Sequence, residues 1–303
     1  MDTTAEPEEA MHRIRTLIPS FRSAIASLTT TSPNLQIVKS YPPRIPSSPS
    51  SQKQRTVCIL DSSFNPPTKA HMHLALQALK KYIPTTTTSG DGSEATQGKE
   101  GEEEPPSLLL LLATTNADKP PTPASYEHRL AMMCLLAEEI QNLDSSLDSS
   151  RAKVPQIDIG ITPHPRFIDK STDLSAHPFF PPESTRQVWI LGYDTLIRLL
   201  NPKYYPPHHT LRDVTTTLLS STNRILVFAR PGAEFGTEAS QHEYSTSLDK
   251  AIADKVDMIV PGKEAEGVSS TNVRNGVKNG TGEWRDGVCS GVAGWIGREG
   301  LYL

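Results

Sequence analysis

Short apolar runs alternate with amphipathic stretches along most of the chain. Runs of strand length occupy residues 56–60, 108–113, 188–191, 225–229 and 256–260. Helical spacing of apolar residues appears near 69–83, 125–140, 194–200, 271–279 and 287–297. This alternation is typical of βαβ units, which form a parallel sheet flanked by helices. The pattern therefore predicts a Rossmann-like α/β fold, with its chemistry in the loops after the carboxyl ends of the strands.

Three other segments depart from that pattern. Residues 11–28 carry apolar side chains near helical spacing, in a helix that Pro19 is expected to interrupt. The Pro and Ser content from Ser32 to Ser51 predicts an irregular lead-in. Residues 85–106 are rich in Thr, Gly, Glu and Ser and offer almost nothing to bury, which predicts a disordered surface insertion. We expect an N-terminal extension at 1–54 and one domain at 55–303.

Charge and cysteine usage narrow the class of protein. A net charge of -4 over 303 residues and a pI near 6.1 give no basic surface for a nucleic-acid backbone. No apolar run approaches the ~20 residues of a membrane span, and the acidic N-terminus lacks the pattern of a signal peptide. The three cysteines are far apart and are expected to be reduced thiols. We predict a cytoplasmic location, with a nuclear one also compatible, and the oligomeric state stays open.

The first candidate site follows the strand at 56–60. There the chain reads Asp-Ser-Ser-Phe-Asn-Pro-Pro-Thr-Lys-Ala-His from Asp61 to His71. Pro67 is suited to a helix start and Thr68 can cap the helix. His71 then falls in the first turn, near the backbone amides of Ser62, Ser63 and Phe64. A helix N-terminus with such amides favours negative charge, so this turn predicts a phosphate site.

The second candidate site begins another helix near the C-terminus. Ser269, Ser270 and Thr271 offer hydroxyls and helix N-terminal amides, and Arg274 lies one turn further on. The forked guanidinium of an arginine can bind the same anion as those groups. Taken alone, this pattern is also typical of an ordinary helix cap followed by a solvated arginine. The two sites together favour the binding of a triphosphate.

Both motifs resemble signatures of the nicotinamide mononucleotide adenylyltransferase family, within the wider HxGH-type nucleotidyltransferase superfamily. Residues 62–71 are similar to the family's Gly-Ser-Phe-Asn-Pro-x-(His/Thr)-x-x-His, and residues 268–274 to its Ile-Ser-Ser-Thr-x-x-Arg. Departures are Ser62 where the family usually has Gly, Ala70 where many members have Gly, and Val268 for Ile. The resemblance spans roughly residues 55–303 and looks like that of a divergent, fungal-like eukaryotic member.

The resemblance implies an activity and roles for the motif residues. The phosphate of nicotinamide mononucleotide would attack the α-phosphorus of ATP, giving NAD and pyrophosphate. His71 and Thr68 would stabilise charge on the reacting phosphate, and Ser270, Thr271 and Arg274 would neutralise the departing pyrophosphate. A Mg²⁺ ion would bridge the phosphates, held largely by ATP and water. We assign no transition metal to the protein.

Further segments resemble the family's nucleotide and acceptor pockets. Gly192 and Asp194 follow the strand at 188–191, where Asp194 either caps the next helix or binds a ligand. Lys119 or Arg129 is implied near the acceptor phosphate. The other residues that the resemblance implies for these pockets are Asn65, Arg230, and Phe167, which would face the pyridine ring and for which core packing is the alternative role.

Two alternative functions stay open. One keeps the chemistry but changes the acceptor to phosphopantetheine, riboflavin phosphate or another phosphorylated metabolite. The other is an ATP-binding or ATP-hydrolysing module of the same fold, which the departures at Ser62 and Ala70 motivate. Intact His71 and Arg274 favour retained transfer chemistry. Pyrophosphate release that depends on an added acceptor would separate a transferase from a binding module.

Overall fold

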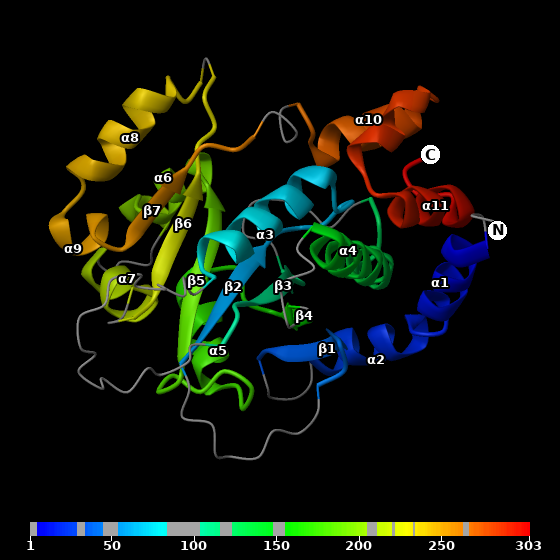
Figure 1. Cartoon of the computed structure of the whole chain (residues 1–303), viewed down its shortest axis with the longest axis horizontal. Helices are drawn as coiled ribbons and strands as arrows, with labels where there is room; N and C mark the ends of the chain where they lie inside the picture. Colours follow the sequence, from blue (N-terminus) through cyan, green and yellow to red (C-terminus); the bar gives the residue numbers. More distant parts are fainter. Residues whose placement is uncertain are drawn as a thin grey trace, which may run out of the picture.

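A seven-stranded sheet forms the centre of the molecule (Figure 1). The computed structural model describes residues 5–28, 34–44, 54–83, 104–115, 123–147, 155–204, 211–219, 222–232, 234–262 and 267–303. The strand order is β1-β4-β3-β2-β5-β6-β7. The strands are β1 (Gln36–Tyr41), β2 (Arg55–Asp61), β3 (Ser107–Ala113), β4 (Ile157–Thr162), β5 (Thr185–Gly192), β6 (Arg224–Phe228) and β7 (Val256–Ile259).

Helices cover both faces of the sheet, so that alternate strand residues enter two separate cores. One core contains Cys58, Leu60 and Leu110 and is covered by α3 (Lys69–Lys81), α4 (Tyr126–Leu147), α10 (Ser270–Lys278) and α11 (Ser290–Glu299). The other contains Ile59 and Trp189 and is covered by α5 (Phe167–Ala176), α6 (Tyr193–Leu199), α7 (Leu211–Leu218), α8 (Glu238–Ser247) and α9 (Lys250–Ala253). Burial on both faces explains why these strands are continuous apolar runs.

The predicted Rossmann-like α/β fold is confirmed. Strands β2 to β7 are parallel, and the chain runs from β2 outward through β3 and β4 before returning to β5 on the other side of β2. The order of the strands thus reverses between β2 and β5. In open α/β sheets the ligand crevice lies outside the carboxyl ends of the strands at such a point. Ser62 and Gly192 lie at this edge, because Leu60 pairs with Ile190.

The irregular lead-in expected from Ser32 to Ser51 is wrong for residues 36–41, which form β1. This strand pairs antiparallel with β4 at the edge of the sheet. The buried carboxylate of Asp158 on β4 accepts hydrogen bonds from the Ser40 hydroxyl at 2.7 Å and from Arg44 Nε at 3.0 Å. The Pro and Ser content of the surrounding segment concealed a strand whose partner is over 100 residues away in sequence.

The predicted helix at 11–28 is two helices, α1 (Ala5–Arg15) and α2 (Ile18–Leu28). The break falls at Thr16 and Leu17, and Pro19 lies in the first turn of α2, where its missing N–H removes no helical hydrogen bond. Helix α1 packs against α4 and α11, and α2 packs against α4 and β1. The boundary at residue 54 between an extension and a domain stays a prediction.

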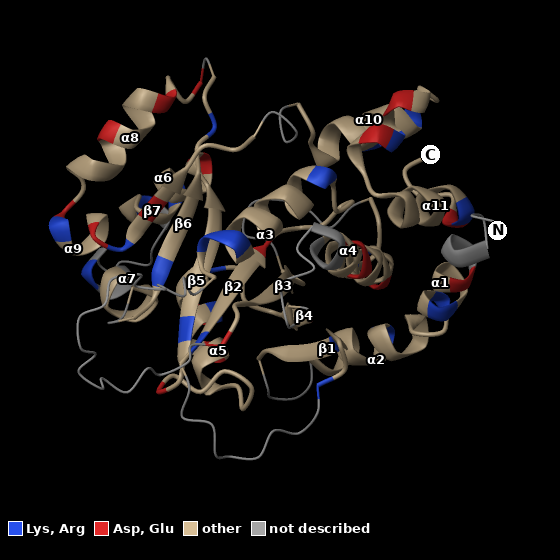
Figure 2. Cartoon of the chain, viewed as in Figure 1, with Lys and Arg blue, Asp and Glu red and all other residues tan. Residues whose placement is uncertain are grey.

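Two other observations concern the surface. Acidic and basic residues are interspersed over the helices on both sides of the sheet (Figure 2). Within the ranges that the structure describes, no helix has the length and apolar character that crossing a bilayer requires. Most of the insertion predicted at 85–106, as far as residue 103, falls outside those ranges.

Ile14→Ala tests whether the N-terminal helices share the main core. Ile14 is fully buried among side chains of that core, so its truncation is expected to lower the free energy of unfolding by about 2–5 kcal/mol. Urea denaturation followed by tryptophan fluorescence measures this change. Arg15→Ala is the control, because this neighbouring side chain is exposed and its ion pair with Glu299 contributes at most about 1 kcal/mol. Equal stability of the two variants would contradict the packing of α1.

Candidate active site

The turn between β2 and α3 begins as a continuation of the sheet. The Ser62 backbone N–H donates to the carbonyl of Leu111 on β3 at 3.2 Å. The chain then reverses through buried residues 64–68, and Thr68 is the N-cap of α3, as predicted. Because the Ser62 amide is engaged by β3, it is not free for the phosphate role that the sequence predicted for it. Ser62 offers its side chain to this edge instead.

Both ring nitrogens of His71 have defined partners. The Thr68 backbone N–H donates to Nδ1 at 3.0 Å, and the Thr68 hydroxyl oxygen lies 2.8 Å from the same nitrogen. Nε2 lies 2.9 Å from the Ser62 hydroxyl oxygen. Since an amide N–H can only donate, Nδ1 must accept, and a neutral ring then carries its hydrogen on Nε2. Burial lowers the pKa of His71 to about 4, so the ring is neutral at pH 7.

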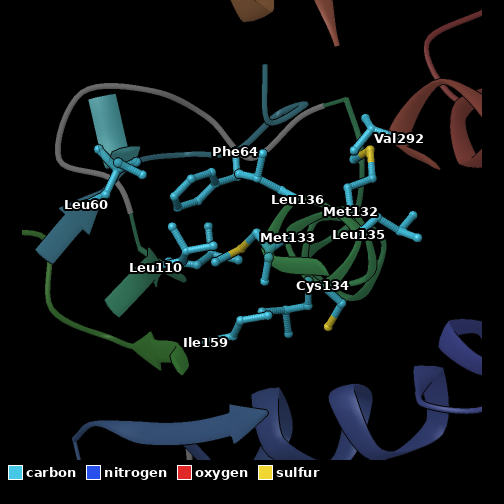
Figure 3. Close-up of a cluster of buried hydrophobic side chains, with 14 of the residues drawn as sticks. Leu60, Phe64, Leu110, Met132, Met133, Cys134, Leu135, Leu136, Ile159 and Val292 are labelled. Atoms are coloured by element: carbon cyan, nitrogen blue, oxygen red, sulfur yellow. The ribbon is translucent and has the colours of Figure 1, made fainter. Parts of the chain in front are cut away.

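Phe64 fixes the turn to the core. Its side chain is fully buried and lies among Leu60, Leu110 and Met133 (Figure 3), with its ring centroid 5.2 Å from that of His71. Its backbone has φ of 43°, a left-handed conformation that costs a bulky residue about 1–3 kcal/mol. Burial of a phenylalanine side chain contributes a similar amount, which offsets this cost. The ring therefore holds an otherwise unfavourable turn in place.

The second motif lies against this turn. Ser270 donates from its hydroxyl to the carbonyl of Pro66 at 2.7 Å, and Arg274 Nη1 donates to the carbonyl of Asn65 at 2.7 Å. Arg274 Nη2 also donates to the Thr271 hydroxyl at 3.1 Å. These contacts bring the N-terminus of α10 to the N-terminal end of α3. The two motifs that the sequence analysis singled out therefore form one site.

Ser269 has a structural role at this site. It is the N-cap of α10, and its hydroxyl accepts the Asn272 backbone N–H at 3.1 Å. This is the ordinary capping contact that the sequence left open as an alternative. A phosphate role for Ser269 stays a prediction.

Sequence reasoning missed Tyr302 and one role of Arg129. The Tyr302 hydroxyl donates to the Asn65 side-chain oxygen at 2.8 Å, although no sequence pattern marked this residue. Arg129 is only 5% exposed and donates to the carbonyls of Ala124 at 2.9 Å and Ser63 at 3.4 Å. The family resemblance implied a place for Arg129 near the acceptor phosphate. It did not indicate these contacts, because the backbone carbonyls that accept them come together only on folding.

Arg129 and Arg274 contact the backbone of the Ser63–Asn65 segment. Among the described residues, neither guanidinium forms an ion pair with a carboxylate. Burial lowers the pKa of Arg129, and the positive charge of Arg274 acts weakly in the same direction. An uncompensated buried charge is unfavourable, so a bound anion would relieve it. This charge distribution favours phosphate at the turn.

The ends of β5 and β6 provide a second group of predicted residues. Gly192 is the N-cap of α6, and a Cβ there would lie 2.8 Å from Asp194 Oδ1, too close for any other residue without a shift. The Asp194 Oδ1 atom lies 3.6 Å from Nη1 of the mostly exposed Arg230. Its Oδ2 atom accepts a hydrogen bond from Arg198 Nη2 at 3.1 Å. Their nucleotide-binding roles stay predictions.

The predicted acceptor residues differ in what the structure shows. Phe167 begins α5, and its partly exposed ring packs edge-on against Trp189 at 5.4 Å between centroids. The Lys170 ammonium lies 5.2 Å from the Phe167 ring and forms a buried ion pair with Asp61, at the end of β2. Phe167 therefore lies on the side of β2 and β5 opposite α3. Lys119 lies outside the described residues.

The strand order and the two helix N-termini that meet at its reversal point define a protein of the Rossmann-like α/β class. A Schizosaccharomyces pombe protein named "Putative nicotinamide mononucleotide adenylyltransferase" is 31% identical over 238 residues, covering 76% of this chain and 78% of that protein. The chain belongs to the nicotinamide mononucleotide adenylyltransferase family. Its membership confirms the resemblance read from the motifs and makes the protein an enzyme of the nucleotidyltransferase class.

The solved structures that match this chain are less similar to it in sequence than the fission-yeast protein. Two are of Plasmodium falciparum nicotinic acid mononucleotide adenylyltransferase, complexed with APC and with NaAD, and each is 14% identical to this chain. The matches cover 82% of this chain and 96% and 98% of those chains, with TM-scores of 0.49 and 0.48. No family model matches the sequence.

The neutral state of His71 is testable by NMR. Because burial lowers its pKa to about 4, we expect the ring to stay neutral, with its hydrogen on Nε2, from pH 7.5 down to about pH 5.5. The unfolded state would protonate near pH 6.5, so the contribution of His71 makes the fold less stable as pH falls from about 6.5 toward 4. Histidine ¹⁵N shifts, assigned by comparison with His71→Gln, measure the protonation state and the tautomer of the ring. Protonation near pH 6.5 in the folded protein would contradict this environment.

Proposed function

We propose that the protein transfers the adenylyl group of ATP to nicotinamide mononucleotide, forming NAD and pyrophosphate. The observation that carries this proposal is the junction of the two motifs, where Ser270 and Arg274 of α10 bond to the carbonyls of Pro66 and Asn65. A triphosphate lying across this junction would meet the first turns of α3 and α10 together. The name of the fission-yeast relative supports nicotinamide mononucleotide as the acceptor.

The reaction needs alignment and charge stabilisation more than covalent help. A phosphate oxygen of the acceptor attacks the α-phosphorus of ATP, while the bond from that phosphorus to the bridging oxygen of pyrophosphate breaks on the opposite side. The donors of the β2–α3 turn would stabilise charge at the α-phosphate. Thr271 and Arg274 would receive the β- and γ-phosphates, with helix N-terminal amides adding to the positive potential. No covalent enzyme intermediate is required.

We expect a Mg²⁺ ion to accompany ATP at this site. Within the described residues, no group of three or more His, Cys, Asp or Glu is arranged to hold a metal ion. The carboxylates near the carboxyl edge, Asp61 and Asp194, form ion pairs with Lys170 and with Arg198. The phosphate oxygens and water would supply most ligands, and the ion would neutralise phosphate charge when bound.

The acceptor would lie on the β5 side of the turn. Phe167 presents a partly exposed ring for a pyridine base. The further acceptor residues that we propose are Asn65, Lys119, Arg230 and the Gly192–Asp194 segment. A cytoplasmic location, with a nuclear one also compatible, belongs to the same proposal.

A product assay tests the proposed reaction. Purified protein with Mg·ATP and a panel of phosphorylated acceptors is expected to release pyrophosphate and form NAD only with nicotinamide mononucleotide. His71→Ala is expected to lower kcat on the order of 10²-fold, because the turn that would face the reacting phosphate loses its imidazole N–H donor. Pyrophosphate release that depends on another acceptor would identify that compound as the substrate in place of nicotinamide mononucleotide. ATP binding without acceptor-dependent release would instead indicate a binding module.

Arg274→Ala tests the role of the guanidinium at the junction of α10 with the β2–α3 turn. Loss of the guanidinium is expected to lower kcat/KM on the order of 10²-fold, because it contacts the turn and would face the leaving pyrophosphate. Lys278→Ala is the matched control, since it removes an exposed cation one turn further along the same helix. Steady-state kinetics with varied ATP measures both variants. Similar losses in the two would indicate a general charge effect and contradict the assigned role.

A further inference from the structure

The contact between Ser62 and His71 brings a hydroxyl within hydrogen-bond distance of an oriented imidazole. Such a pair, with a third group holding the far ring nitrogen, has the outline of a serine nucleophile and its general base. The hydrogen-bond directions exclude that role here. A base needs a free lone pair on Nε2, whereas the Thr68 N–H occupies the lone pair of Nδ1 and places the hydrogen on Nε2. His71 therefore donates to Ser62, and Ser62 accepts.

That direction leaves the Ser62 hydroxyl hydrogen available to another acceptor. The Ser62 backbone N–H is already used by the Leu111 carbonyl. Among the described residues, His71 is the only hydrogen-bond partner of the Ser62 hydroxyl. Ser62 is also partly exposed, at the carboxyl edge of the central strand. Its oxygen therefore accepts from His71, while its own hydrogen stays available for an acceptor at this edge of the sheet.

We propose that Ser62 is a catalytic residue, whose hydroxyl donates a hydrogen bond to an oxygen of the α-phosphate while His71 donates to Ser62 from behind. Donors arranged in series polarise one another, so the neutral imidazole strengthens the hydroxyl as a donor. No proton is transferred and no covalent bond to Ser62 forms. The resemblance implied that His71 contacts the phosphate directly. In this proposal His71 acts on the phosphate through the Ser62 hydroxyl. This inference rests on the proposed adenylyl transfer.

Three serine variants test the proposal. Ser62→Ala removes the donor and is expected to lower kcat on the order of 10- to 100-fold, with a smaller change in KM for the acceptor. Ser62→Thr keeps a hydroxyl at the same carbon and is expected to retain most of the activity. Ser107→Ala is the control, because it removes a hydroxyl at the amino end of the adjacent strand β3. That hydroxyl donates to the Thr56 carbonyl, away from the carboxyl edge of the sheet. Circular dichroism establishes that all three variants fold.

Binding and tautomer measurements make the test independent of turnover. Affinity for a nonhydrolysable ATP analogue with a methylene bridge between the α- and β-phosphorus, measured by calorimetry with Mg²⁺, is expected to fall in Ser62→Ala and not in Ser107→Ala. Histidine ¹⁵N shifts are expected to show the hydrogen of His71 on Nε2. A hydrogen on Nδ1 would reverse the direction of the Ser62 contact and overturn the proposal.

The kinetic outcomes are distinct. If Ser62→Ala is as active as the parent protein, or more active, then Ser62 competes with phosphate for His71 and the proposal is wrong. If the parent protein forms no dinucleotide with any acceptor, the proposed function has failed, and the analogue affinities decide the role of Ser62. A weaker affinity in Ser62→Ala alone then supports it as a phosphate ligand, and equal affinities overturn it.

Discussion

The hydrogen bond from Arg274 to the carbonyl of Asn65 joins segments that are 209 residues apart. Without it, the β2–α3 turn and the N-terminus of α10 would each be an ordinary helix start. With it, and with the Ser270 contact to Pro66, the positive ends of two helices meet at the point where the strand order reverses. The sheet forms the crevice, and the helix ends at this junction make the crevice favourable for a negatively charged ligand.

The direction of hydrogen bonding within the turn depends on a single backbone amide. Thr68 ends the turn as the N-cap of α3, and its N–H meets Nδ1 of a ring that lies three residues further on. This contact determines which ring nitrogen carries hydrogen, and burial keeps the ring neutral. The result is an array of neutral donors with the cation of Arg274 close by. Such an array suits a reaction in which charge moves between phosphate oxygens without proton transfer to the protein.

Much of the fold was predictable, because the strands buried on both faces are continuous apolar runs. The helix at α3 was also predictable, since Pro67 and Thr68 mark its start in any structural context. Strand β1 was not, because its six residues depend on pairing with β4 and on the buried Asp158 for their stability. Local composition carries no signal for a partner that distant.

The candidate site shows the same division. His71, Arg274 and their neighbouring hydroxyls were identified from two local motifs. The contact of Tyr302 with Asn65 was not identified, because it joins residues 237 apart in sequence. No sequence pattern indicates that these two side chains are partners. The direction of the His71–Ser62 hydrogen bond was also hidden, since it follows from the position of one amide hydrogen. The sequence contains the two side chains, but the direction of the hydrogen bond between them is determined by a backbone amide.

The central claim is that the junction of α3 and α10 at the end of β2 holds the triphosphate of ATP. A crystal structure with Mg²⁺ and a nonhydrolysable ATP analogue tests this claim most directly. The account predicts the α-phosphate beside Ser62 and His71, and the β- and γ-phosphates beside Thr271 and Arg274. A triphosphate bound elsewhere on the protein, with this junction unchanged, would contradict it.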